Sequence, residues 1–261
     1  MDIRIPSNIL LPFPILPAPP LVEIPGGEWE LVRNSLPAVA NRYFQKSFRP
    51  LDRSNWVLRN RKTKTVWMST SPMERESQSH HVFAAHGRVL VGGLGLGAVL
   101  WSLLEKSSVE EVVVVERDEK VIALMTSVWL KSKPWARHIS GPRFHLVQGD
   151  ALDPSGWPEF TRSRPFDFGI IDIWPSIGDM ELRPDMKRMA TALPQVKEWA
   201  AWGLELDFVS WKIEQNLRAF ENPPSLWREY SDSIGVPLLG REWPWMAELA
   251  SAAAMVQSLR L

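Results

Sequence analysis

The sequence contains no cysteine in its 261 residues. This absence excludes a disulfide framework, a thiolate nucleophile and a cysteine-ligated metal. It is compatible with a reducing compartment, and we expect a cytoplasmic protein.

An excess of charge of either sign is also missing. The 30 lysines and arginines balance the 30 aspartates and glutamates, so the formal net charge is zero. A neutral chain lacks the electrostatic field that attracts nucleic acids or anionic membranes. We therefore expect no nucleic-acid partner.

Long apolar runs are absent as well. No segment approaches the roughly 18 consecutive apolar residues that a membrane-spanning helix requires, and we expect no membrane partner. The N-terminal stretch, residues 1–27, is apolar but interrupted by prolines, which prevent a continuous helix. It is predicted to be an extended, polyproline-like arm, and the alternative is a poorly ordered terminus. Its prolines are Pro6, Pro12, Pro14, Pro17, Pro19, Pro20 and Pro25.

Two further regions follow the arm. Residues 28–86 are predicted to form a small β-hairpin region, because Asn55–Thr70 alternates apolar and polar residues on both sides of a basic turn. Residues 87–261 are predicted to form one larger domain that carries the ligand site.

In this larger domain, apolar strands alternate with segments of helical spacing. Val109–Glu116 contains four successive valines, which suits a strand buried on both faces of a parallel sheet. The alternation predicts an α/β fold with a Rossmann-like, doubly wound, mainly parallel sheet. Further strands are expected at residues 88–93, 144–150 and 166–174, and helices at 97–107 and 118–130.

The C-terminal part is expected to begin with helical structure from Pro184 to Trp202, with a break near Pro194. A further strand is predicted over Leu204–Trp211, and residues 243–261 are predicted to be helical. No convincing antiparallel strand pair follows Trp211.

Four glycines, Gly92, Gly93, Gly95 and Gly97, follow the first strand of the domain. A loop that leaves such a strand must turn tightly and let its backbone approach a ligand where no Cβ intervenes. The helix that begins near Gly97 would present its N-terminal N–H groups to the same place. The glycines therefore predict a binding loop, and the alternative is a turn with only a packing role.

Glu116 ends the next strand, 19 residues after Gly97. A carboxylate at this place can accept hydrogen bonds from both hydroxyls of a ribose. Together with the glycine loop, Glu116 predicts a nucleoside ligand. NAD stays open as that ligand, because Gly93-x-Gly95-x-x-Ala98 also satisfies a relaxed dinucleotide fingerprint.

Two aspartates end the following strands, Asp150 in the segment QGDA and Asp172 in the segment DFGIIDIWP. With the glycine loop and Glu116, this succession resembles the class I S-adenosylmethionine-dependent methyltransferases over residues 88–175. The β-hairpin that precedes the VLVGG loop makes the chain more similar to the spermidine-synthase-like branch of that class.

The resemblance implies that S-adenosylmethionine is the cofactor. It implies that the glycine loop, Glu116, Asp150 and Ala151 hold this cofactor, and that Asp172 faces the transferred group.

In this branch, the segment before the glycine strand also supplies a polar contact to the cofactor. Here the corresponding segment offers Gln78, with Glu76 and His80 as alternatives.

The chain also departs from the aminopropyltransferases of this branch. Those enzymes carry an acidic residue within the glycine loop, where this chain has Leu94 and Leu96, and a second acid close to the catalytic one, where this chain reads DIWPS. Only two tyrosines, Tyr43 and Tyr230, are available for a polyamine site. These departures favour methyl transfer over aminopropyl transfer.

The leading hypothesis is therefore an S-adenosylmethionine-dependent methyltransferase that acts on an unidentified small-molecule or protein acceptor by in-line transfer. Asp172 is the candidate base or orienting acceptor, and the alternative is a structural hydrogen bond. In the following segment, Trp174 and Pro175 are candidates for stacking on the acceptor or the adenine, with packing of the tryptophan as the alternative. Asp179, Glu181 and Asp185 are candidates for an acidic lip, with a solvated loop as the alternative. The remaining functional alternatives are an aminopropyltransferase, an NAD-dependent oxidoreductase and a non-catalytic nucleoside-binding protein.

No metal site is expected. His80 and His81 are adjacent and, on a strand, could not both face one ion. A homodimer is compatible with the Pro-rich arm and the Ala-rich C-terminal helix.

Overall fold

The computed structural model describes residues 14–45, 48–50, 52–174, 181–217, 223, 225–243 and 245–258. Residues 1–13 of the expected arm therefore lie outside the described residues.

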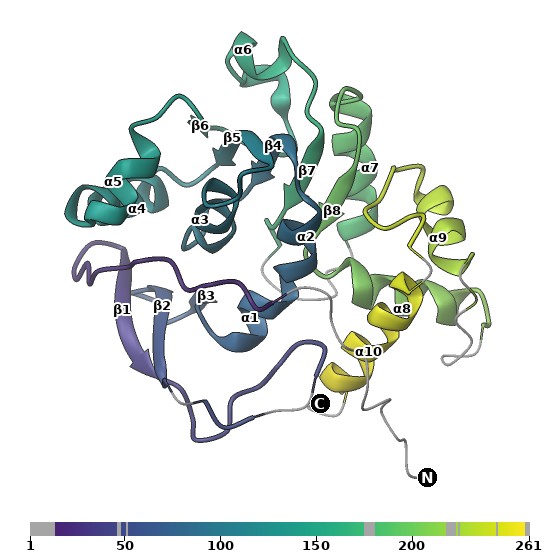
Figure 1. The fold of residues 1–261 in the computed structure, drawn as a ribbon, viewed down its shortest axis with the longest axis horizontal. Coiled ribbons are helices and arrows are strands. Elements are labelled where there is room, and N and C mark those ends of the chain that lie inside the picture. Colours follow the sequence, from purple (N-terminus) through teal and green to yellow (C-terminus); the bar gives the residue numbers. More distant parts are fainter. Residues whose placement is uncertain are drawn as a thin grey trace.

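A five-stranded parallel sheet forms the centre of the molecule (Figure 1). Its strands lie in the order β6-β5-β4-β7-β8. Along the sequence, the chain starts with the middle strand β4, continues outward through β5 to β6, and then returns to β7 on the other side of β4. This reversal places a topological switch point between β4 and β7, where ligands bind in open α/β sheets. The fold is Rossmann-like α/β, as predicted. The strands are β4 (Gly87–Gly92), β5 (Val109–Glu116), β6 (Phe144–Gln148), β7 (Phe168–Ile171) and β8 (Trp199–Ala201).

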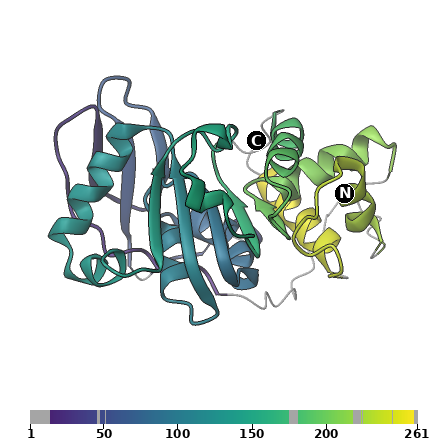
Figure 2. The same ribbon diagram turned by 90° about the horizontal axis from the view of Figure 1, so that it is seen from above.

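The valine run of β5 is buried on both faces of the sheet, as expected. Val112 and Val114 belong to one hydrophobic cluster, and Val113 and Val115 to another, because successive side chains of a strand point to opposite faces. The first cluster includes residues of α3 (Ala98–Leu104), α4 (Glu119–Lys131) and α5 (Lys133–Ile139), and the second includes residues of α7 (Leu182–Ala192) and the C-terminal helices. Helices thus cover both faces, and the C-terminal helices form a lobe on one side (Figure 2).

The N-terminal region forms a second, antiparallel sheet of β1 (Trp29–Ser35), β2 (Ser54–Asn60) and β3 (Val66–Ser69). Strands β2 and β3 confirm the predicted hairpin. Two short helices, α1 (Pro72–Ser77) and α2 (Ser79–Ala84), connect this sheet to β4. After β6 the chain contains a 3-10 turn, η1 (Pro154–Gly156), and the short helix α6 (Glu159–Arg162).

The strand predicted over Leu204–Trp211 is wrong, because this segment lies in helix α8 (Leu204–Glu214). Its buried residues Leu204, Asp207, Phe208 and Trp211 follow helical spacing, which a short alternation of apolar and polar residues concealed. Gly203, with φ of 88°, starts the helix at a position that favours glycine.

The helix expected from Pro184 to Trp202 is only partly correct. Helix α7 ends at Ala192, before Pro194, and Trp199–Ala201 form strand β8 instead. β8 is fully buried and pairs with β7, so the sheet determines its conformation. The two helices that follow α8 are α9 (Leu226–Ile234) and α10 (Met246–Ser258), the latter as predicted.

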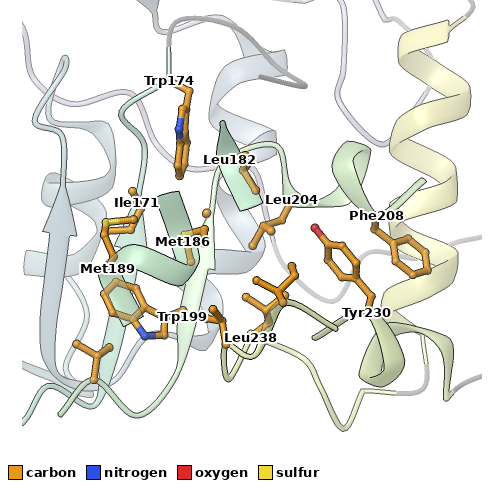
Figure 3. Packing of buried hydrophobic residues seen from close by; sticks show 14 of the residues in the cluster. Ile171, Trp174, Leu182, Met186, Met189, Trp199, Leu204, Phe208, Tyr230 and Leu238 are labelled. Atoms are coloured by element: carbon orange, nitrogen blue, oxygen red, sulfur yellow. The ribbon is translucent and has the colours of Figure 1, made fainter. Parts of the chain in front are cut away.

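Side chains from both the sheet and the C-terminal helices meet in one core (Figure 3). Trp199 of β8 and Met186 of α7 are fully buried there, and the rings of Phe208 and Tyr230 pack edge to face with centroids 5.4 Å apart. Beyond Trp211, the described residues contain helices, turns and one isolated parallel bridge, between Leu238 and Trp199 of β8, but no further strand. No helix among the described residues is long and apolar enough to cross a membrane.

Replacing Leu90 by alanine is expected to lower the free energy of unfolding by about 2–5 kcal/mol, because Leu90 is 1% exposed in the middle strand and its removal leaves a cavity. The control Ile213→Ala, at a position 64% exposed on α8, is expected to change it by no more than about 0.5 kcal/mol. Urea denaturation followed by circular dichroism measures both values. Equal effects of the two substitutions would contradict this placement of the core.

Candidate functional site

The glycine loop follows β4 at the switch point of the sheet. Gly93, Gly95 and Gly97 have φ values of 92°, 48° and 70°, in the region that favours glycine. A Cβ at Gly93 would lie 2.2 Å from the backbone oxygen of Asp172, and one at Gly95 would lie 2.4 Å from Sδ of Met68. The glycines therefore let the loop pack against β7 and against the N-terminal hairpin. Glycine is required at these positions for this packing as well as for the approach of a ligand.

Glu116 lies directly beside this loop. Its Oε2 accepts a hydrogen bond of 2.9 Å from the backbone N–H of Leu94, and its Oε1 accepts one of 2.8 Å from the N–H of Asp118. These two bonds fix the carboxylate at the first crossover of the sheet. Each oxygen keeps a further lone pair, so the group can still accept from a ligand hydroxyl.

A cavity opens at the carboxyl ends of the central strands, and we call it the main cavity. The glycine loop, the ends of β5, β6 and β7, and the hairpin residues Trp67 and Met68 line it. Five acidic side chains lie in its wall, whereas Arg117 is the single basic one among the described residues that line it. The acids are Glu74, Glu116, Asp150, Asp172 and Asp185.

The structure brings most of the predicted site residues to this cavity. Gly93, Gly95, Glu116, Asp150, Ala151 and Asp172 line it. An adjoining space, the side cavity, shares Gly93, Glu74 and Asp172 with the main cavity and is also lined by Gln78 and Arg75.

Gly92 and Gly97 line neither cavity. A Cβ at Gly92 would lie 2.9 Å from Cδ1 of Ile171, and one at Gly97 would lie 3.2 Å from the ring of Trp135. The structure thus gives these two glycines packing roles in the sheet and at the start of α3.

Asp172 follows β7, and its backbone N–H donates to the oxygen of Gly92 at 2.8 Å. Its Oδ2 accepts a hydrogen bond of 2.8 Å from the Nε2 of Gln78. Burial and the negative charge of Glu74 together raise the pKa of Asp172 to about 7, although the hydrogen bond from Gln78 opposes the rise. The carboxyl is therefore partly protonated near neutral pH, a property suited to proton transfer.

Glu74 is the partner acid that the sequence analysis missed. Its carboxylate accepts hydrogen bonds of 2.9 and 2.8 Å from the backbone N–H of Ser69. Burial raises the pKa of Glu74 to about 7, although the bonds from Ser69 lower it. Two acids of raised pKa thus face the same two cavities.

A signal for Glu74 was present in the sequence. Ser71-Pro72-x-Glu74 has the pattern of a helix start, and the Ser71 Oγ does accept from the N–H of Glu74 at 3.3 Å. A helix starting there turns Glu74 and Gln78, four residues apart, to one face.

Glu76 and His80, the alternatives to Gln78, point elsewhere. Glu76 is buried and forms an ion pair with Arg42. The Nε2 of His80 contacts the Oε1 of Glu205 in α8. Neither residue lines the main or the side cavity, so of the three only Gln78 reaches the site.

His80 and His81 lie on helix α2, so the argument that placed them on a strand was wrong. Both Nε2 atoms face the Oε1 of Glu205, that of His81 at 3.5 Å. The three donor atoms lie within 4.8 Å of one another. His80 and Glu205 nevertheless touch directly, which leaves no room for an ion between them. We therefore interpret the group as a hydrogen-bond network.

The residues that replace the loop acid of aminopropyltransferases are part of the core. Leu94 is 5% exposed and Leu96 is fully buried. In the segment after β7, the Nε1 of Trp174 donates to Oδ2 of Asp185 at 2.9 Å, and both residues line the main cavity. Pro175 and Asp179 of this segment lie outside the described residues.

Comparisons with known proteins give a likeness to solved structures only. No protein-family profile and no curated protein sequence matches this chain. Spermidine synthase from Thermotoga maritima is similar with 17% identity over 69% of this chain and 55% of that one, at a TM-score of 0.38. A spermidine synthase in complex with the transition-state analogue AdoDATO is 18% identical over 66% of this chain and 52% of that one, at a TM-score of 0.36.

An S-adenosylmethionine-dependent methyltransferase from Clostridium acetobutylicum is 14% identical over 46% of this chain and 44% of that one, at a TM-score of 0.30. This chain thus spans about half the length of the spermidine synthases that it matches. Similarity at this level concerns the fold and does not extend to activity.

The raised pKa of Asp172 predicts a pH-dependent stability. Its folded-state pKa lies above the unfolded value, so the folded state binds more protons between about pH 4 and 7, and stability falls as the pH rises through this range. Asp172→Asn removes this contribution, which is at most about 1.4 kcal/mol per pH unit. The free energy of unfolding of the variant minus that of the wild type is expected to be larger at pH 8 than at pH 4.5, as measured by urea denaturation. Parallel pH profiles of the two proteins would contradict this.

Proposed function

We propose that this protein is an S-adenosylmethionine-dependent transferase and that it transfers a methyl group to a small-molecule or protein acceptor. The observation that carries the proposal is the main cavity itself: a glycine loop at the first crossover, with Glu116 bonded to it and four more acids around it. In a chain without net charge, this local excess of acids favours a cationic ligand.

The residues present suit an adenosine that bears a positively charged sulfur. The carboxylate of Glu116 would accept from the ribose hydroxyls, and that of Asp150, which already accepts from the N–H of Leu152 at 2.9 Å, would accept from the adenine amino group. Arg75 in the side cavity is the cation that would pair with the carboxylate of the methionine part. Asp172 and Glu74 lie where both cavities meet.

When bound, S-adenosylmethionine supplies a methyl carbon that is already activated by the sulfonium charge. The protein therefore mainly aligns the acceptor and excludes water. Asp172 would accept the proton that the acceptor loses, since its pKa of about 7 lets it gain and release a proton near neutral pH. Glu74, beside it, would orient a basic acceptor through its charge.

Aminopropyl transfer is a second candidate because of Glu74. One of the three sequence departures that spoke against it was the lack of a second acid near Asp172, and helix α1 supplies one. Arg75 favours methyl transfer, because a decarboxylated donor offers no carboxylate to pair with it. NAD fits less well, since its diphosphate would face a mainly acidic wall.

Replacing Glu116 by glutamine is expected to weaken S-adenosylmethionine binding by at least about tenfold, because one charged acceptor of the ribose hydroxyls is lost. The control is Glu110→Gln, an exposed acid of the same strand, whose affinity is expected to stay at the wild-type value. Isothermal titration calorimetry measures both. Wild-type affinity in the Glu116 variant would refute the assignment.

A second test identifies the group that is transferred. The protein is incubated with a panel of amine acceptors and either S-adenosylmethionine or its decarboxylated form, and the products are separated by mass spectrometry. Methyl transfer produces S-adenosylhomocysteine, whereas aminopropyl transfer produces methylthioadenosine. Asp172→Asn is expected to lower turnover by about 10²- to 10⁴-fold while the affinity for the donor changes by less than about threefold. Release of methylthioadenosine alone would favour the second candidate, and unchanged turnover in the variant would remove Asp172 from catalysis.

A further inference from the structure

A chain of buried polar groups leads from Asp172 into the interior. The Gln78 amide lies between Asp172 and His81: its Nε2 is 2.8 Å from Oδ2 of Asp172, and its Oε1 is 2.8 Å from Nδ1 of His81. The Nε2 on the far side of the His81 ring is 3.5 Å from Oε1 of Glu205. Gln78, His81 and Glu205 are each at most 5% exposed.

We propose that Gln78, His81 and Glu205 are positioning residues for Asp172: the position of the proton on the His81 ring selects which end of the Gln78 amide faces Asp172. The ionisation of the site carboxyl is thereby tied to a buried carboxylate on another element of the fold. This link between His81 and Asp172 does not depend on the proposed function. Only its meaning for catalysis rests on the proposed role of Asp172.

The first of two arrangements keeps the orientation of the Gln78 amide that the structure shows. The Gln78 NH₂ group donates to an ionised Asp172, so its carbonyl must accept from a proton on Nδ1 of His81. Burial and the nearby charge of His80 together lower the pKa of His81 to about 4, although Glu205 opposes this effect, so the ring carries a single proton at neutral pH. Its Nε2 is then bare and faces the Glu205 carboxylate, a contact between two acceptors.

The second arrangement removes this conflict. The amide turns over, its NH₂ group donates to Nδ1 of His81, and the ring proton on Nε2 donates to Glu205. The Gln78 carbonyl now faces Asp172, which must be protonated to donate to it. One proton has been taken up by Asp172 from the cavity, while the ring keeps one proton that has changed from Nδ1 to Nε2.

Glu205 is suited to impose the second arrangement because it acts as a fixed acceptor. Burial alone would raise its pKa, but the charge of His80 and the hydrogen bond that His80 donates outweigh this effect and hold the pKa well below its usual range. The hydroxyl of Tyr43 also donates to its Oε2 at 3.2 Å. Ionising Asp172 therefore costs the hydrogen bond between His81 and Glu205, in addition to the cost of burial.

Other charged groups line the cavities around Asp172 and are separate from this chain of polar groups. They lie on α1, β5 and α7 and in the segments that follow β5 and β6. They are Glu74, Arg75, Glu116, Arg117, Asp150 and Asp185. None of them contacts His81 in the described part of the structure, so none of them selects a tautomer of His81. Glu74 raises the pKa of Asp172 through its charge.

The test reads the tautomer directly and needs no ligand. Long-range ¹H–¹⁵N correlation spectra distinguish Nδ1–H from Nε2–H histidine, and the full chain has only five histidines. The carboxyl ¹³C signal of labelled Asp172, assigned by its loss in Asp172→Asn, gives the midpoint of its titration. Below that midpoint His81 is expected to be in the Nε2–H form, and above it in the Nδ1–H form. The same tautomer on both sides, or a doubly protonated ring throughout, would overturn the proposal.

Two variants distinguish the coupling between His81 and Asp172 from general effects of a substitution on the fold. In Gln78→Leu, the tautomer of His81 is expected to stay constant while Asp172 titrates. In Glu205→Gln, whose amide can donate to a bare Nε2, the midpoint of Asp172 is expected to fall by about one pH unit or more. The control is Glu111→Gln, a buried acid near the start of β5 paired with Arg88, and it is expected to leave the midpoint unchanged.

An unchanged titration midpoint of Asp172 in Glu205→Gln, or an equal shift of that midpoint in Glu111→Gln, would overturn the proposed coupling of Asp172 to Glu205. Should Glu205→Gln not fold, the wild-type tautomer measurement still decides. A failure to bind S-adenosylmethionine would refute the proposed function and leave this result intact, so the two failures are distinguishable.

Discussion

The close approach of the glycine loop to the end of β7 is the constraint on which the site depends. Gly93 has no Cβ, and a Cβ there would collide with the backbone oxygen of Asp172 at 2.2 Å. This contact, together with the hydrogen bond from the Asp172 N–H to Gly92, holds the ends of β4 and β7 together at the switch point of the sheet. Glu116 holds the other side of the loop through Leu94. The cavity is thus shaped by main-chain contacts, and the acids around it are placed by the strands that they end.

Electrostatics then gives this cavity its character. The chain as a whole is neutral, yet five acids meet in one wall, and burial raises the pKa of two of them to about 7. Such a site can hold a cation or a proton at little cost, whereas an anionic ligand would meet repulsion. The second sheet contributes as well, because Met68 of β3 packs on Gly95 and its sulfur accepts from the N–H of Leu96 at 3.2 Å. The N-terminal region therefore forms part of the site.

Much of this arrangement could be predicted from local sequence patterns, and each wrong prediction has a physical reason. The valine run, the hairpin and the acids at the strand ends are patterns of residues that are close in the sequence. The local spacing of apolar and polar residues was therefore sufficient to predict them. Leu204–Trp211 was mistaken for a strand because its short alternation fits both periods, and only the packing of α8 decides between them. Glu74 and the contact of His81 with Glu205 were missed because no helix was predicted over residues 72–84 and the two histidines were considered on a strand, whereas two short helices orient these side chains. Contacts between α2 and α8 join residues more than 120 positions apart, which no local pattern contains.

The central claim is that the glycine loop and the strand-end acids form a pocket for an adenosine with a positively charged sulfur. Thermal unfolding in the presence of S-adenosylmethionine, S-adenosylhomocysteine or NAD tests it most directly, because a ligand that binds only the folded state raises the unfolding temperature by mass action. A concentration-dependent rise is expected with the two adenosyl sulfur compounds and none with NAD. A rise with NAD alone, or no rise with any of the three, would contradict it.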